Sequence, residues 1–156
     1  MVDPPLHLQH TPLKDIPNGP YEAFKQIVEI TRANRSPHSI EQGLARLFPK
    51  VNSEAHRARA EVLSQLDPDA LTYSLENHHL TGLNLDSLLT QVECPTLLIQ
   101  GNPELGAALF DEDVNRALTL LRHGTWMSIP DGGHMLQHSH PEAIASALNN
   151  FYDQRM

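Results

Sequence analysis

Two stretches near the C-terminal end decide the fold. They are Cys94-Pro95-Thr96-Leu97-Leu98-Ile99-Gln100-Gly101 and Trp126-Met127-Ser128-Ile129-Pro130-Asp131-Gly132-Gly133-His134-Met135. The first predicts a buried strand over 96–100, and the second predicts a short strand that stops just before Gly-Gly-His. Open α/β sheets do their chemistry at the carboxyl ends of their strands. A histidine on a glycine-rich bend at that edge is therefore a candidate catalytic group.

The hydrophobic pattern divides the chain at Gly82. Before it, apolar residues at helical spacing predict four short amphipathic helices and no strand. They cover 21–34, 39–48, about 53–66 with Val62 and Leu63 on the inner face, and a segment that opens at Asp67-Pro68. After Gly82 the pattern predicts helix, strand, helix, strand and helix over 85–92, 96–100, 111–122, 126–129 and 141–152. This alternation is typical of a parallel sheet and indicates an α/β fold.

Composition limits the classes of partner. The chain has 156 residues, enough for one domain or for a small core with an insertion, and 40% of them are hydrophobic. The net charge is −8 and no Lys/Arg cluster occurs, which argues against a nucleic-acid partner. No apolar run approaches the length of a membrane span, and the N-terminal residues lack the pattern of a signal peptide. We therefore expect a cytoplasmic protein with no membrane partner.

Cysteine and histidine usage gives no sign of a metal site. The single cysteine, Cys94, excludes an intramolecular disulfide, and its place before Pro95 predicts a small buried core residue. His134, His138 and His140 are closely spaced, but no cysteine or paired carboxylate accompanies them, so solvated loop histidines are expected rather than zinc ligands. His78-His79 is expected to be an exposed pair near a helix end. We predict no cofactor and no metal.

The order of strand, acidic loop, helix, strand, Gly-Gly-His-Met and a closing helix over 94–152 resembles the C-terminal part of α/β-hydrolase-fold enzymes. Asp3-Pro4-Pro5 is similar to the family segment that follows the strand before the helical cap. The resemblance implies three segments: 1–10 as the end of a core strand and the entry to the cap, 11–83 as an all-helical cap, and 84–156 as the C-terminal core segment with its parallel sheet.

The resemblance also implies roles for three residues. His134 matches the catalytic histidine, the general base that takes a proton from a nucleophile and returns it to the leaving group. The acid that orients it is open between two candidates. Glu104 follows the first strand at Gly101-x-x-Glu104, and Asp3 follows the earlier strand, where some members place the acid. We rank Glu104 slightly ahead of Asp3.

The family's nucleophile elbow, Gly-x-Ser-x-Gly, does not occur in the sequence, because no serine has glycine two positions before and two positions after it. Matched to the family, the chain begins about halfway through the fold. The leading hypothesis is a serine hydrolase that acts on a small ester, amide or related substrate with an apolar portion. The chain would carry the cap and C-terminal half and would be inactive alone.

The alternative hypothesis is a non-catalytic binding or assembly module from a truncated or split hydrolase gene. A sheet that stops next to Asp3 has an unpaired edge, and such edges attract partners. This hypothesis predicts a homo-oligomer, or pairing with a complementing N-terminal half.

Overall fold

The computed structural model describes residues 1–16, 19–78 and 80–153. Contacts divide the chain into two compact units, residues 1–11 with 82–156, and residues 12–81. Each unit has its own hydrophobic core.

The first unit is built on two parallel strands, β1 (Thr96–Gln100) and β2 (Gly124–Ser128), as the sequence predicts. Thr96 pairs with Gly124 and Gln100 pairs with Ser128. The first residues of the chain run along the other side of β1, where Val2 forms a parallel bridge to Ile99. β1 is therefore the central strand, and the segment that ends at Asp3 lies beside its carboxyl end.

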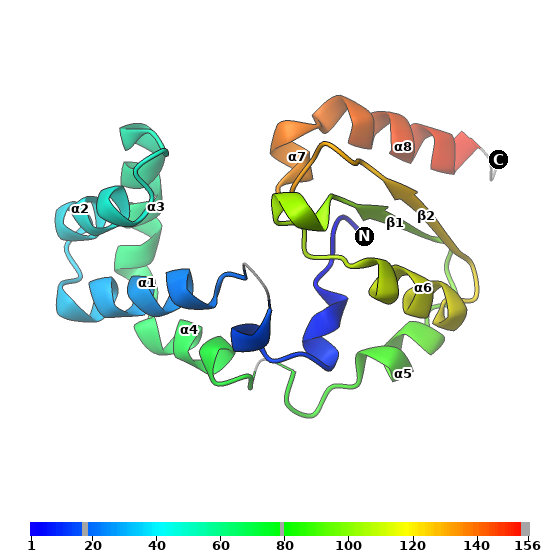
Figure 1. The fold of residues 1–156 in the computed structure, drawn as a ribbon, viewed down its shortest axis with the longest axis horizontal. Coiled ribbons are helices and arrows are strands. Elements are labelled where there is room, and N and C mark those ends of the chain that lie inside the picture. The colour runs from blue at the N-terminus through cyan, green and yellow to red at the C-terminus, as the bar shows by residue number, and fades with distance from the viewer. Residues whose placement is uncertain (17–18, 79, 154–156) are drawn as a thin grey trace. The chain divides into compact units, whose positions relative to one another are not determined.

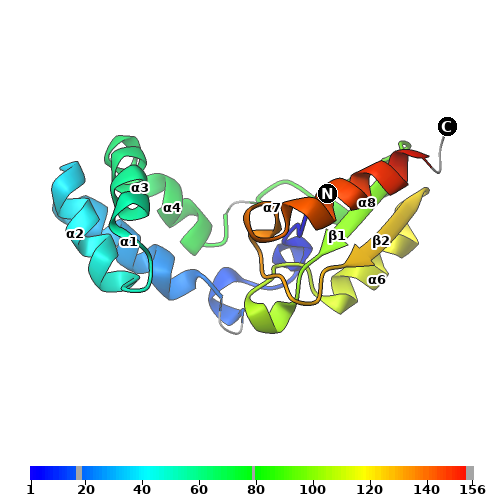
Figure 2. The same cartoon turned by 90° about the horizontal axis from the view of Figure 1, so that it is seen from above.

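Helices cover both faces of this sheet (Figure 1). Because side chains alternate along a strand, β1 contributes to two cores. Leu98 packs with α5 (Leu85–Thr90) and α6 (Asp111–Leu120), whereas Leu97 and Ile99 pack with α7 (Leu136–Ser139) and α8 (Pro141–Asp153). Two 3-10 helices, η1 (Leu6–Gln9) and η3 (Pro103–Leu105), complete the unit. The unit is a three-layer α/β/α arrangement, and Figure 2 shows α8 running along β1.

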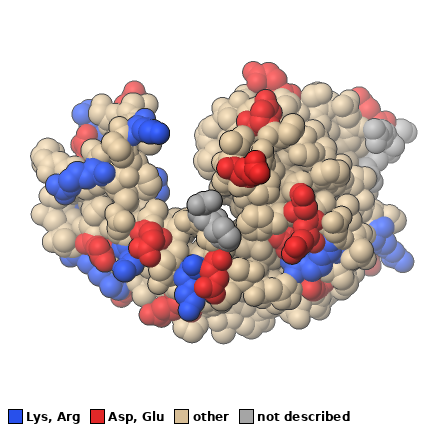
Figure 3. Space-filling model, in the orientation of Figure 1, with Lys and Arg blue, Asp and Glu red and all other residues tan. Residues whose placement is uncertain are grey.

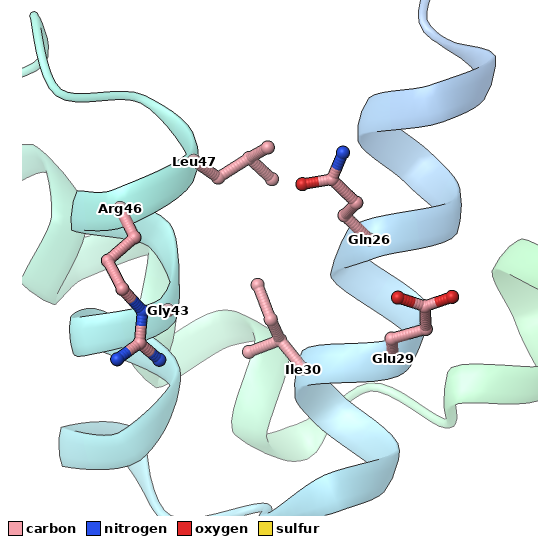
Figure 4. A pocket seen from close by; sticks show the side chains of 6 residues that line it. All are labelled: Gln26, Glu29, Ile30, Gly43, Arg46 and Leu47. Atoms are coloured by element: carbon pink, nitrogen blue, oxygen red, sulfur yellow. The ribbon is translucent and has the colours of Figure 1, made fainter.

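The second unit is all-helical within the described residues. It contains η2 (Leu13–Asp15), α1 (Tyr21–Ala33), α2 (Pro37–Leu47), α3 (Ser53–Gln65) and α4 (Pro68–Leu75). Its core consists of five buried apolar residues: Ile27, Ile40, Leu44, Ala60 and Leu63. Ile30 of α1 and Leu47 of α2 pack against this core (Figure 4). The four predicted helices are thus present within a few residues of their predicted bounds.

Polar caps explain where these helices begin. The Asp67 side chain accepts a hydrogen bond from the Asp69 amide and Pro68 occupies the first turn, as predicted. Helix α2 begins at Pro37, two residues before the predicted start at 39, because Ser36 is its cap and Pro37 opens its first turn. Asn52 and Asn84 cap α3 and α5 in the same way.

Some predictions of burial are wrong. Val62 is 68% exposed on the outer face of α3, and only Leu63 of that pair lies in the core. Cys94 is exposed in the bend that precedes β1. Both errors concern single residues, whose direction depends on the exact rotation of a helix or bend. His78 is exposed, as expected, and His79 lies outside the described residues.

The surface charge and the hydropathy of the helices bear on the expected partners. Figure 3 shows acidic and basic side chains interspersed on the visible face, without a large basic patch. None of the described helices combines the length and the apolar character that crossing a bilayer requires.

Candidate active site

The candidate site is built around Asp3, which lies where the N-terminal segment leaves the sheet. Its amide donates a hydrogen bond to the Ile99 carbonyl at 2.6 Å, and the Ile99 amide donates to the Met1 carbonyl at 2.9 Å. These two bonds hold Asp3 beside the carboxyl end of β1. Its φ of 42° lies in the left-handed region, which aspartate tolerates better than most residues. The conformation turns the chain away from the strand and directs the side chain inward.

The Asp3 carboxylate is fully buried and accepts four hydrogen bonds. Oδ1 accepts from the amides of Gly101 at 3.2 Å and Leu109 at 3.1 Å. Oδ2 accepts from the Ala108 amide at 2.6 Å and lies 2.9 Å from Nδ1 of His134. A buried carboxylate is costly unless its oxygens are bonded in this way. Three backbone donors therefore fix the carboxylate so that it meets the imidazole.

His134 lies on the loop after β2, and its side chain is 51% exposed. A carboxylate can only accept, so the bond to Asp3 places the imidazole proton on Nδ1. The neutral ring then has Nε2 as its free acceptor. This arrangement is the one that a histidine needs in order to act as a general base with an oriented tautomer.

Two glycines let the His134 loop approach the loop after β1. A side chain at Gly133 would place its Cβ 2.5 Å from the Leu105 carbonyl oxygen, and a side chain at Gly132 would collide with Leu136. The Asn102 amide also donates to the Gly132 carbonyl at 2.6 Å. Close backbone contact between the two loops, rather than a positive φ, explains the glycine pair before His134.

The structure does not bring Glu104 to His134. Glu104 is exposed in η3, and its amide donates to the Asn102 side chain at 2.9 Å. Within the described residues, no hydrogen bond or ion pair joins its carboxylate to His134. Of the two carboxylates considered from the sequence, Asp3 is the one in contact with the imidazole.

His138 lies in α7, and His140 directly follows that helix. The His140 Nδ1 lies 2.8 Å from the Ser139 hydroxyl, and its Nε2 lies 3.4 Å from an Asp131 carboxylate oxygen. In the described parts of the chain, no three His, Cys, Asp or Glu side chains gather as metal ligands would.

A buried histidine, His7, lies behind the site and was not singled out from the sequence. Its Nδ1 lies 2.8 Å from the Ala108 carbonyl and 4.0 Å from an Asp113 carboxylate oxygen. Burial lowers the pKa of the His7 imidazole, although the hydrogen bond to Ala108 and the Asp113 charge act in the opposite direction. Burial likewise raises the pKa of the Asp113 carboxyl, opposed by the Arg116 guanidinium.

Sequence reasoning also missed the backbone donors of Gly101, Ala108 and Leu109. Such donors carry no side-chain signature, so no residue type marks them. The one available signal for His7 was its position, four residues after Asp3.

Two solved structures resemble this chain in fold. Comparison with family models gives no match, and neither does comparison with curated proteins. Among solved structures, E-2-(acetamidomethylene)succinate hydrolase superposes with a TM-score of 0.52 at 20% identity over 85% of this chain. An esterase, EaEST from Exiguobacterium antarcticum, superposes with a TM-score of 0.50 at 16% identity over 84% of this chain. The chain has part of an α/β-hydrolase fold.

This partial α/β-hydrolase fold agrees with the fold class predicted from the sequence. The chain corresponds to 52% and 47% of the two matched chains, so it spans about half of their length. At these levels of identity the likeness concerns the fold.

Proposed function

We propose that the chain supplies the histidine and the acid of a serine-hydrolase-type active site for a small ester, amide or related substrate. The contact between Asp3 and His134 at the carboxyl edge of the sheet carries this proposal. Asp3 orients the ring and stabilises the imidazolium, and Nε2 of His134 takes the proton of the nucleophile and returns it to the leaving group. Glu104, ranked first from the sequence, has no part in this proposal.

The reaction class has support from the two solved structures with the same fold. One is described as a hydrolase of a succinate derivative and the other as an esterase. Both descriptions fit acyl-transfer chemistry, for which a base and its orienting acid are the central parts.

The nucleophile has to come from outside these 156 residues, because none of their serines lies in Gly-x-Ser-x-Gly. We therefore expect the isolated chain to be inactive. We place the serine in a complementing N-terminal half, whether it is joined to this chain or separate from it. Residues 12–81 would then be the cap of the complete enzyme.

The residues around His134 support the proposal that the substrate has an apolar portion. Met135 follows it directly, and the Leu105 carbonyl lies against Gly133 just before it. Leu105 and Met135 are 56% and 50% exposed, so both offer apolar surface on the two loops that meet at Gly133 and His134. Such surface favours an alkyl or aryl group over a charged one.

The test compares the chain alone with the chain joined to a segment that carries Gly-x-Ser-x-Gly, taken from the coding sequence upstream or from a matched structure. The substrate is an unactivated short-chain alkyl ester, because a lone imidazole slowly attacks activated aryl esters. We expect no turnover by the chain alone. We expect turnover by the joined protein that is lost in His134→Ala and Asp3→Asn and kept in Glu104→Gln.

Two results would contradict the proposal. One is turnover by the isolated chain that disappears in His134→Ala. The other is turnover by the joined protein that survives His134→Ala.

A second function, an assembly module, is supported by the edge of the sheet. The backbone of Ile99 bonds to the Met1 carbonyl and to the Asp3 amide, which flank Val2. In this parallel pairing the N–H and C=O of Val2 itself point away from β1. Val2 holds that position, is 40% exposed, and has no backbone hydrogen bond to another described residue. A hollow of about 290 Å³ lies beside it, lined by Val2, Leu97, Leu148, Phe151 and Tyr152 among others. An added strand would pair with this edge and cover the hollow.

Association is measured by light scattering at micromolar concentration, alone and with the complementing segment. Val2→Lys should weaken association by charging the edge. Val62→Lys is the control, because Val62 is also an exposed valine, at 68% against 40% for Val2, but lies in the helical unit. This function would be excluded if the wild-type chain were strictly monomeric alone and also failed to bind the complementing segment.

A further inference from the structure

We propose that His7 is a positioning residue that orients the Asp3 carboxylate through the peptide group between Ala108 and Leu109. This inference deepens the proposed function, since it rests on the pairing of Asp3 with His134. His7 does not touch the place of the substrate or the reacting nitrogen. It acts on His134 through two groups that lie between them, the Ala108–Leu109 peptide and the Asp3 carboxylate.

The contacts form one continuous series. His7 Nδ1 lies 2.8 Å from the Ala108 carbonyl oxygen, and a carbonyl can only accept, so Nδ1 carries the proton. The amide of the same peptide group belongs to Leu109 and donates to Oδ1 of Asp3 at 3.1 Å. Oδ2 of Asp3 then meets His134 at 2.9 Å.

The bond from His7 affects the donors of Asp3 in two ways. A hydrogen bond to a peptide carbonyl polarises the peptide group and makes its N–H a stronger donor. The same bond also prevents the peptide from rotating. Because Ala108 donates to Oδ2 at 2.6 Å and Leu109 to Oδ1, rotation of this segment would release both carboxylate oxygens.

The segment needs such an anchor because it has no regular secondary structure. Residues 106–110 connect η3 to α6. The Leu109 carbonyl has its own anchor, the Gln100 side-chain amide at 3.0 Å. For the Ala108 carbonyl, the described residues offer one hydrogen-bond donor, and it is His7.

His7 is itself held rigidly. It is 8% exposed, and its ring lies 4.8 Å from the Phe110 ring, centroid to centroid, at an interplanar angle of 58°. The charged groups around it are Asp113 at 4.0 Å, Arg116 and the Asp3 carboxylate. Burial lowers the pKa of His7, so the ring is neutral near pH 7 and carries its one proton on Nδ1.

Two substitutions separate the donor from the ring. His7→Phe keeps an aromatic ring against Phe110 but removes the donor. His7→Asn places an amide N–H at the position of Nδ1 and removes the ring. If the donor matters, His7→Phe disturbs the site and His7→Asn restores it.

The measurement is NMR of the full chain, which needs no catalysis. The ring ¹⁵N shifts of His134 report which nitrogen carries the proton. In His7→Phe we expect the share of the Nδ1–H tautomer to fall towards that of a free imidazole. We also expect the Leu109 amide to exchange about fivefold faster, the factor for one average hydrogen bond. In His7→Asn both readouts stay near their wild-type values.

His56→Phe is the matched control. His56 is 3% exposed and its Nε2 lies 3.1 Å from the Phe48 carbonyl, but it belongs to the helical unit. Loss of that buried histidine should leave the ring shifts of His134 unchanged.

Several results would overturn the inference. They are unchanged His134 shifts in His7→Phe, equal disturbance by His7→Phe and His7→Asn, or disturbance by His56→Phe. The wild-type chain provides a further check that requires no variant: ring ¹⁵N shifts that place the His7 proton on Nε2 would also overturn it. Asp3→Asn separates this inference from the proposed function. If it leaves the His134 shifts unchanged, the Asp3–His134 pair itself fails. If it changes them and His7→Phe does not, the role of His7 alone fails.

Discussion

Nδ1 of His134 lies 2.9 Å from Oδ2 of Asp3, although 131 positions separate the two residues in the chain. The contact joins the first few residues to the loop after the last strand. It depends on the bridge between Val2 and Ile99 and on the amides of 101, 108 and 109. The two residues belong to one compact unit, so the contact follows from the fold of that unit alone.

The two candidate acids are expected to differ sharply in their effect on stability. Asp3→Asn replaces a buried charged acceptor of four hydrogen bonds with an amide, which leaves at least one donor unpaired. We expect a loss of about 3 kcal/mol in the free energy of unfolding. Glu104→Gln changes an exposed side chain and should cost less than about 0.5 kcal/mol. Urea denaturation of both variants measures the difference, and equal losses would contradict the assignment of Asp3.

His134→Ala is expected to affect chemistry and not folding. Its side chain is half exposed, and Asp3 keeps its three backbone donors without it. The free energy of unfolding should change by less than about 1 kcal/mol. Turnover by the joined protein should fall by about a thousandfold or more, since the general base is lost. A variant that unfolds at room temperature would show that His134 has a structural role instead.

The pH dependence of stability should reveal His7. Its pKa in the folded chain is lowered from 6.5, so the unfolded chain binds a proton more readily. The contribution of His7 to the free energy of unfolding is therefore fully present above pH 6.5 and decreases as the pH falls below that value. Denaturation curves at several pH values should show a steeper loss on the acid side in wild type than in His7→Asn, whose amide does not titrate.

The titration of Asp113 should change the stability with pH in the opposite direction to that of His7. Burial raises its pKa above 3.8, so the folded chain holds the proton more tightly, and its contribution to stability falls as the pH rises from 3.8 through the raised value. Both His7→Asn and wild type keep Asp113, and the His7 charge lowers the Asp113 pKa, so the difference between them reports His7 together with its effect on Asp113. An identical pH dependence for the two proteins would contradict a neutral buried His7.

The glycine before His134 should tolerate substitution poorly. In Gly133→Ala the new Cβ would lie 2.5 Å from the backbone carbonyl of Leu105, which cannot move away like a flexible side chain. We expect a loss of roughly 2–3 kcal/mol by thermal or urea denaturation, together with changed ring shifts of His134.

Gly106→Ala is the control for this prediction. Gly106 has a φ of 85° but no atom within 4 Å of a new Cβ, so only the backbone conformation is strained, at a cost of about 1 kcal/mol. A larger loss for Gly106→Ala than for Gly133→Ala would show that crowding between the loops is unimportant.

The sequence by itself determined the order and type of the main elements and the place of His134. Helices and strands follow from the period of apolar residues and from caps such as Asp67-Pro68, and these signals act over a few residues. The short elements η1, η2, η3 and α7 were not predicted, because three or four residues carry too little periodicity. The direction of Val62 and the exposure of Cys94 were wrong for a related reason, since each depends on a small rotation within its element.

Tertiary structure alone decided which carboxylate meets the imidazole. The family resemblance made both Glu104 and Asp3 candidates, because members of the family place the acid after either of two strands that end at the same edge of the sheet. The choice depends on three backbone amides that converge on Asp3 and on a buried His7 that holds one of their peptide groups. Backbone donors have no residue identity, and contacts between residues 98 or more positions apart leave no local pattern. For that reason the sequence left two candidates for the acid. Only the folded chain shows that Asp3 is the one in contact with His134.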